Sequence, residues 1–183
     1  MKNLLALILM VASTITYAQK TTLDSLNVNG IKLRSIGPAF MTGRIADIAL
    51  DPEDENHWYV AVGSGGVWET KNGGITFKPI FDRQKVYSIG CATIDPSNNN
   101  RIWVGTGENV GGRHISFGDG IYKSEDGGAT WKNMGLKTSE HISKIIVHPE
   151  NSDVIWVASQ GPLWNGGGER GLYKSTDGGE SWK

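Results

Sequence analysis

The sequence of 183 residues contains one cysteine, Cys91, and almost no excess charge of either sign. A single cysteine excludes an intrachain disulfide and a metal site built on several thiolates, and within an apolar run it favours a buried small hydrophobe over a nucleophile. The 18 basic and 19 acidic residues are interspersed and give a formal net charge of −1. Without a basic surface we expect no nucleic-acid partner.

Helical periodicity is absent after the N-terminus, and so is any metal-ligand spacing of the four histidines. The glycine runs at 111–112 and 166–168 are not followed by a predicted helix. A phosphate cradle needs the N-terminus of such a helix, so these runs do not form one. We therefore expect no metal and no cofactor.

The one sustained apolar run, residues 4–12, is preceded by Lys2 and followed by small and polar residues up to Ala18. This pattern predicts a cleavable signal peptide over residues 1–18. The run is shorter than the roughly 18 residues that a membrane span needs, so we expect no span in the mature chain. A secreted, periplasmic or cell-surface location follows, with residues 19–30 as a polar lead-in segment.

One short phrase occurs three times. It reads SEDGGATW at 124–131, STDGGESW at 175–182 and, less closely, TKNGGITF at 70–77. The closing aromatics Phe77, Trp131 and Trp182 are 54 and 51 residues apart. A repeat of this length predicts supersecondary units that stack on one another.

Each phrase ends a larger unit in constant register. A β-branched run stopped by proline comes first (44–52, 88–96, 141–149), then a second strand (58–62, 102–106, 155–159) and a third (66–70, 120–124, 171–175). The paired glycines suit a tight hairpin into a fourth strand. The sequence therefore predicts an all-β fold, a β-propeller with four-stranded antiparallel blades at about 31–82, 83–136 and 137–183.

The third predicted blade lacks its fourth strand. Propellers close with roughly four to eight blades, and about three blades cannot make a ring. We expect a truncated chain, in which the remaining blades of the same longer protein complete the fold.

The repeated phrase resembles the Asp-box, or BNR repeat. That repeat occurs in sialidases, xyloglucan-cleaving glycoside hydrolases, sortilin-type receptors and a photosystem assembly factor. The string Gly37-Pro38, Gly43-Arg44-Ile45 and Gly65-Gly66-Val67-Trp68 is similar to the sortilin N-terminal type of propeller in large secreted bacterial proteins, which are often labelled glycosyl hydrolases. The resemblance covers about residues 31–183 and implies the fold more specifically than the activity.

The acids of the boxes have a structural interpretation. An Asp or Asn in a tight hairpin accepts backbone N–H bonds, and the aromatic that follows packs into the blade. We assign this role to Asn72, Phe77, Asp126, Trp131, Asp177 and Trp182. Because strands alternate in direction, the box turns should lie on the face opposite the loops between second and third strands.

Those other loops differ in length between the units. From the second-strand valine to the glycine that opens the third strand there are 6, 16 and 14 residues, so two insertions fall in the same loop type. Long loops on a rigid scaffold commonly carry function. The predicted ligand-binding rim consists of Arg44, Glu108, Arg113, His114, His141, Trp164 and Arg170, and the candidate catalytic carboxylates are Glu108, Glu140 and Glu169.

Two functions remain open at this point. A recognition module for an extracellular peptide, protein or polysaccharide needs only a shaped polar rim. A glycoside hydrolase needs two suitably spaced carboxylates. Xyloglucan-cleaving relatives place one just after the second strand of the first blade, where this chain has Val62-Gly63-Ser64-Gly65-Gly66, and Arg44-Ile45 lacks the proline of the sialidase Arg-Ile-Pro signature. Recognition is therefore the primary hypothesis and hydrolysis the alternative.

Overall fold

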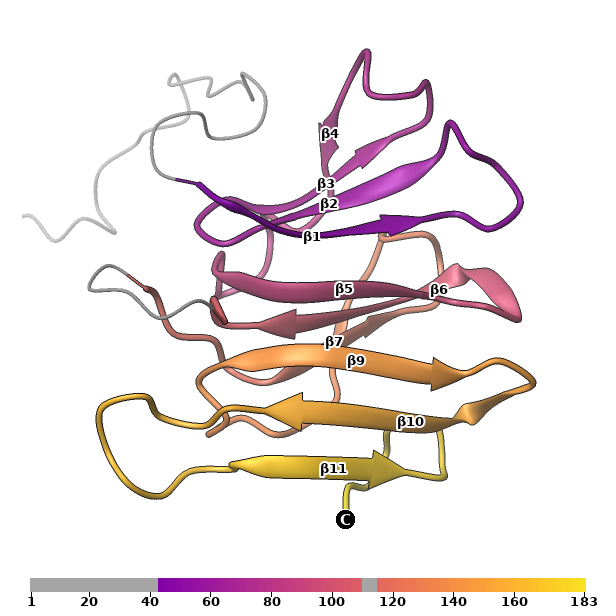
Figure 1. The fold of residues 1–183 in the computed structure, drawn as a ribbon. Coiled ribbons are helices and arrows are strands. Elements are labelled where there is room, and N and C mark those ends of the chain that lie inside the picture. The colour runs from indigo at the N-terminus through magenta and orange to yellow at the C-terminus, as the bar shows by residue number, and fades with distance from the viewer. Residues whose placement is uncertain (1–42, 110–114) are drawn as a thin grey trace, which may run out of the picture. The chain divides into compact units, whose positions relative to one another are not determined.

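The computed structural model describes residues 43–109 and 115–183, and the strands within them form three antiparallel sheets (Figure 1). The first sheet contains β1 (Ile45–Leu50), β2 (Trp58–Val62), β3 (Gly66–Thr70) and β4 (Lys78–Pro79) in that order. The second contains β5 (Ile89–Asp95), β6 (Asn98–Thr106), β7 (Ile121–Ser124) and β8 (Lys132–Asn133). The third contains β9 (Ile142–His148), β10 (Asn151–Ser159) and β11 (Gly171–Ser175).

Each sheet is one blade, which confirms the predicted all-β propeller with about three blades. In blades 1 and 2 the fourth strand pairs through Glu69 with Lys78 and through Lys123 with Lys132. In blade 3, Lys174 and Lys183 exchange two backbone hydrogen bonds of 2.8 and 3.0 Å at the same spacing. The described segments contain no helix with the length and apolarity needed to cross a membrane.

The blades pack face to face, with the inner strands β1, β5 and β9 side by side (Figure 1). Neighbouring residues of β6 explain the continuous apolar pattern of blade 2. Ile102 and Val104 belong to the cluster shared with blade 1, whereas Trp103 belongs to the cluster shared with blade 3. A blade covered on both faces needs apolar side chains at successive positions of its second strand, as in β6 of blade 2. In β10 of blade 3, by contrast, buried and half-exposed residues alternate.

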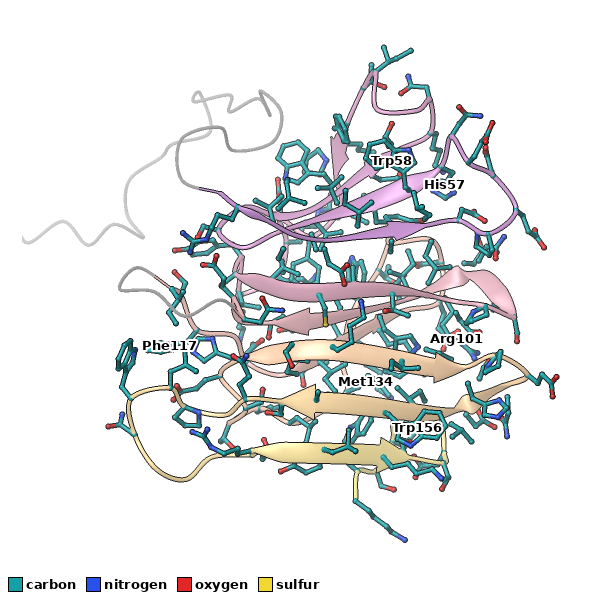
Figure 2. All side chains as sticks on the ribbon, in the orientation of Figure 1. His57, Trp58, Arg101, Phe117, Met134 and Trp156 are labelled. Carbon is teal, nitrogen blue, oxygen red and sulfur yellow. The ribbon has the colours of Figure 1, made fainter. Side chains whose placement is uncertain are left out.

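The two ends of the sheets carry different loops. The box turns and the turns between first and second strands lie at one end, the box face, where Gly73, Gly127 and Gly178 donate backbone hydrogen bonds to the neighbouring turns. The other end, the insertion face, carries the described loop residues 63–65, 107–109, 115–120 and 160–170 and the segments that enter the inner strands. Figure 2 shows His57 and Arg101 toward the box face and Phe117 at the insertion face.

Candidate functional site

Every blade places one residue at the insertion-face end of its inner strand in the same way. The carbonyl oxygens of Arg44, Ser88 and His141 accept hydrogen bonds of 2.8, 2.7 and 2.8 Å from the residue that follows the second strand of the same blade. The same backbone hydrogen bond thus occurs in all three blades, whereas the side chain at this position differs. It is a guanidinium in blade 1, a hydroxyl in blade 2 and an imidazole in blade 3.

Arg44 of blade 1 reaches Glu108 of blade 2. Its Nε and Nη2 both lie 2.6 Å from Glu108 Oε1, and the carboxylate is fully buried while the arginine side chain is 54% exposed. The hydrogen bond to Glu108 raises the pKa of Arg44. A Cβ at Gly63 would lie 2.6 Å from the same oxygen, so glycine makes room for the carboxylate. Glu108 Oε2 is buried, and no residue in 43–109 or 115–183 forms a hydrogen bond with it.

Ser88 fixes the backbone of Glu108. Its hydroxyl accepts a hydrogen bond of 3.0 Å from the Glu108 N–H and donates one of 2.8 Å to the carbonyl oxygen of Ser116. The start of the longer insertion is thereby attached to the entrance of β5. The Glu108 carboxylate sits on a rigid backbone.

His141 completes a chain of contacts across the three blades. Its Nδ1 lies 2.8 Å from the carbonyl oxygen of Glu108, and because a carbonyl can only accept, Nδ1 carries the proton. Burial lowers the pKa of His141, so the ring is neutral at pH 7. Its Nε2 is buried and has no hydrogen-bond partner among the described residues. Glu108 Oε2 and His141 Nε2 are thus two buried acceptors that no described residue uses.

The seam between blades 2 and 3 is closed by Asn109. Its side-chain amide donates to the carbonyl oxygens of Gly90 at 3.1 Å and Ser143 at 3.2 Å. Gln160 in turn donates to the Asn109 carbonyl oxygen at 3.1 Å. The first residues of the two insertions are therefore tied to each other and to the inner strands.

Three large aromatic side chains project from the insertion face into solvent. Tyr87 is 58% exposed, Phe117 57% and Trp164 71%. The other large exposed hydrophobic residues of the described segments are aliphatic, and they lie on β1, β9, β11 and the first box turn. The Tyr87 hydroxyl lies 3.3 Å from Ser116 Oγ, and the Phe117 ring lies 5.6 Å from the ring of His141.

The other two predicted carboxylates, Glu140 and Glu169, differ in their surroundings. Glu169 accepts hydrogen bonds of 2.8 and 3.0 Å from the backbone N–H and hydroxyl of Thr138, which tie two loops of blade 3 together. Glu140 has a positive φ of 56° and is half-buried, and its carbonyl oxygen accepts from Gly118 at 2.7 Å. Arg170 donates to the carbonyl oxygen of Pro162.

Three predicted rim residues, Arg44, Glu108 and His141, are therefore brought together. Trp164 and Arg170 lie farther along the same face, in the loop of blade 3. Arg113 and His114 lie outside the described residues. Among the described residues, no group of three or more His, Cys, Asp or Glu could hold a metal ion.

The box residues lie on the opposite face and are bonded within their own turns. Asp126 accepts from the Thr130 hydroxyl at 2.6 Å and N–H at 2.8 Å and from Ser124, and these bonds lower its pKa to about 2. Asn72 and Asp177 accept the corresponding backbone bonds, at 2.9 Å each. The indoles of Trp131 and Trp182 donate to Ile80 and Met134, each in the preceding blade, and Phe77 packs edge-on against Trp58.

Sequence reasoning did not select Ser88, Asn109, Tyr87 or Phe117 as site residues. The constant register contained a signal for Ser88, since it occupies the position of Arg44 and His141. Tyr87 precedes it directly, and Phe117 stands in the insertion already identified. Asn109 carries no comparable signal, because its role depends on how closely β5 and β9 approach.

Comparison with known proteins gives a consistent family. The family model described as Sortilin-Vps10 (Sortilin, neurotensin receptor 3) matches residues 43–183. The chain is 28% identical over 135 residues to a xyloglucanase of Hypocrea jecorina, covering 64% of the chain and 15% of that protein. It is 26% identical over 154 residues to a probable oligoxyloglucan-reducing end-specific xyloglucanase of Neosartorya fischeri, covering 74% and 17%. The chain thus spans less than a fifth of these relatives.

Solved structures show the same fold. The GH74 enzyme of Niastella koreensis is 25% identical with a TM-score of 0.56, covering 74% of this chain and 20% of that one. YCF48 from Cyanidioschyzon merolae is 20% identical with a TM-score of 0.51, covering 77% and 36%. An auxiliary nutrient binding protein from Bacteroides thetaiotaomicron is 11% identical with a TM-score of 0.53, covering 76% and 29%. These likenesses confirm an Asp-box-like propeller.

Proposed function

Because the chain belongs to the Sortilin-Vps10 family, whose fold alone does not define a ligand, we propose that its insertion face recognises a polysaccharide. The proposed ligand is a neutral glucan chain of the xyloglucan class. The curated relatives named as xyloglucanases support this class of ligand.

The exposed aromatic side chains of the insertion face carry the proposal. Tyr87, Phe117 and Trp164 come from three different loops and are each more than half exposed. An aromatic ring offers a large, rigid apolar surface at little entropic cost, and the C–H face of a pyranose ring packs against such a surface. Several platforms on one face suit a polymer, which repeats the same sugar ring along its length.

Polar groups beside these rings suit sugar hydroxyls. In the part of the chain that the structure describes, Glu108 Oε2 and His141 Nε2 are buried acceptors without partners, and a buried polar atom without a partner is destabilising until a donor reaches it. The Arg44 guanidinium, which is bound to the Glu108 carboxylate, is half exposed and can donate hydrogen bonds to sugar oxygens. Acceptors and donors next to apolar platforms are the composition expected of a carbohydrate site.

Hydrolysis is the second candidate function, and the names of the xyloglucanase relatives favour it. It needs two carboxylates about 5–10 Å apart, one of them free to transfer a proton. One oxygen of the Glu108 carboxylate is bound by the Arg44 guanidinium, and the Glu169 carboxylate accepts two hydrogen bonds from Thr138. Two of the three candidate carboxylates are therefore already bound by protein groups, which favours binding over acid–base catalysis.

Calorimetric titration of the full-length protein with a xyloglucan oligosaccharide tests the proposal. Each of Tyr87→Ala, Phe117→Ala and Trp164→Ala should weaken binding by about three- to tenfold through loss of one aromatic platform. Ile75→Ala is the matched control, because Ile75 is 82% exposed on the box face. Unchanged affinity in all three aromatic variants would exclude the insertion face, and release of new reducing ends by the wild type would favour hydrolysis.

Export is part of the proposal. The predicted signal peptide, residues 1–18, lies outside the described residues, and an extracytoplasmic location suits a polysaccharide ligand. N-terminal sequencing of the protein from its native host should begin near Gln19. A retained Met1 on protein recovered from the cytosol would contradict this location.

A further inference from the structure

A second hollow lies at the outer edge of blade 2, away from the Arg44–Glu108–His141 cluster. Its volume is about 470 Å³, and it lies between residues 83–85 and the strands β7 and β8. Its lining includes Arg83, Lys85, Asp119, Trp131, Asn133 and Lys137. We propose that this hollow binds an acidic sugar, a hexuronate unit of a glycan.

Unpaired positive charge is the first reason. Arg83, Lys85 and Lys137 are exposed, and none of them forms an ion pair with a carboxylate of the described segments. Three basic side chains and one acidic side chain line the hollow, although the whole chain is slightly acidic. Unneutralised cations around a concave surface attract an anion.

The second reason is a fixed aromatic wall. The Trp131 indole N–H is held by the carbonyl oxygens of Ile80 at 2.9 Å and Gly128 at 3.1 Å, and the ring packs edge-on against Phe81 at 5.1 Å. The ring is only half buried, and it lines the hollow. A rigid, partly exposed ring is a surface on which the C–H face of a pyranose can pack.

Asp119 gives the third reason. Its Oδ2 accepts the Tyr122 hydroxyl at 2.8 Å, and its backbone carbonyl oxygen accepts the Asn133 amide at 3.0 Å. Its Oδ1 is buried and has no partner among the described residues. A sugar hydroxyl is a donor that suits this oxygen.

The three features together select the ligand class. The cations require a negative group, the indole requires an apolar ring face, and Asp119 requires a hydroxyl donor. A hexuronate carries a carboxylate, a pyranose face and hydroxyls on one ring. A neutral sugar lacks the charge, and inorganic phosphate lacks the ring.

Titration of the full-length protein with tri-galacturonate tests this site, with cellotriose and inorganic phosphate as the competing ligand classes. Arg83→Gln and Lys137→Gln should each weaken tri-galacturonate binding by about tenfold, and added salt should weaken the wild-type interaction. Lys71→Gln is the matched control, because it removes one positive charge from the box face and does not line this hollow.

The site is independent of the polysaccharide surface proposed above. Phe117→Ala should leave tri-galacturonate binding intact, and Arg83→Gln should leave xyloglucan binding intact. Equal tri-galacturonate affinity in wild type and in the Arg83→Gln, Lys137→Gln double variant would overturn the inference. So would cellotriose or phosphate binding as tightly as tri-galacturonate.

Discussion

Replacement of Gly90 by alanine should open the seam between blades 2 and 3. Gly90 lies in β5, where the backbone of β9 approaches most closely. An added Cβ would overlap the Ile142 carbonyl oxygen and lie 2.5 Å from the carbonyl oxygen of Gly107. Both obstacles are backbone atoms, which cannot rotate away as the end of a side chain can. The two inner strands must therefore separate.

The size of the effect follows from what that separation disrupts. Overpacking of a close-packed interior is destabilising by about 1–3 kcal/mol. The Asn109 amide bridges Gly90 and Ser143 across the same seam at 3.1 and 3.2 Å, and each lost hydrogen bond adds about 1 kcal/mol. We expect a total of about 3–5 kcal/mol, which at roughly 2–4 °C per kcal/mol for 150–250 residues lowers the melting temperature by about 6–20 °C.

Thermal and urea unfolding of the full-length protein, followed by tryptophan fluorescence, measures this effect. Trp103 is buried in the cluster shared by blades 2 and 3 and reports on the seam. Gly166→Ala is the matched control, because no atom lies within 4 Å of its added Cβ. If Gly90→Ala melted together with Gly166→Ala and the wild type, the inferred close approach of β5 and β9 would be refuted.

Three further predictions concern the blades themselves. Hydrogen bonds from Thr130 lower the pKa of Asp126 to about 2. Their stabilising effect is therefore complete above about pH 4 and is lost as the pH falls toward 2. Over that range the urea midpoint of Asp126→Asn should decline less than the urea midpoint of the wild type. Trp131→Phe removes the N–H that reaches Ile80 and should lower the free energy of unfolding by about 1 kcal/mol, measured by urea titration; an unchanged midpoint would contradict this. Burial raises the pKa of Cys91 to about 12, so a thiol reagent should modify it only in denaturant, and rapid labelling of the native protein would show an accessible thiol.

The fold was accessible to sequence reasoning because its signals are local. The box turns use glycines with positive φ, such as Gly127 at 66° and Gly128 at 88°, and these are visible as a repeated phrase. The starts of β6 and β10 were less visible. The structure extends them back to Asn98 and Asn151, whereas the apolar pattern begins at Ile102 and Ile155. Asn98 pairs with Asp95 and Asn151 with His148 beyond a shift in register, and hydrophobic patterning does not detect such polar pairs.

The site was only partly accessible, because its contacts connect distant segments. Register alone placed Arg44 and His141 at the ends of inner strands. It could not show that Arg44 reaches Glu108, 64 residues away, or that the absence of a side chain at Gly63 leaves space for the carboxylate. The cationic hollow was even less accessible to sequence reasoning, since its lining comes from the segment before β5 and from both outer strands of blade 2. Such groupings depend on packing between blades, which single-sequence patterns do not encode.

The backward reach of the box tryptophans has a consequence for synthesis of the chain. Trp131 bonds to Ile80, 51 residues earlier, and Trp182 bonds to Met134, 48 residues earlier. Translation proceeds at about 5–20 residues per second, so the outer part of a newly emerged blade waits about 3–10 s for the indole that holds it. Each blade is completed by its successor, and we expect the nascent chain to gain protease resistance in steps, one blade behind the ribosome.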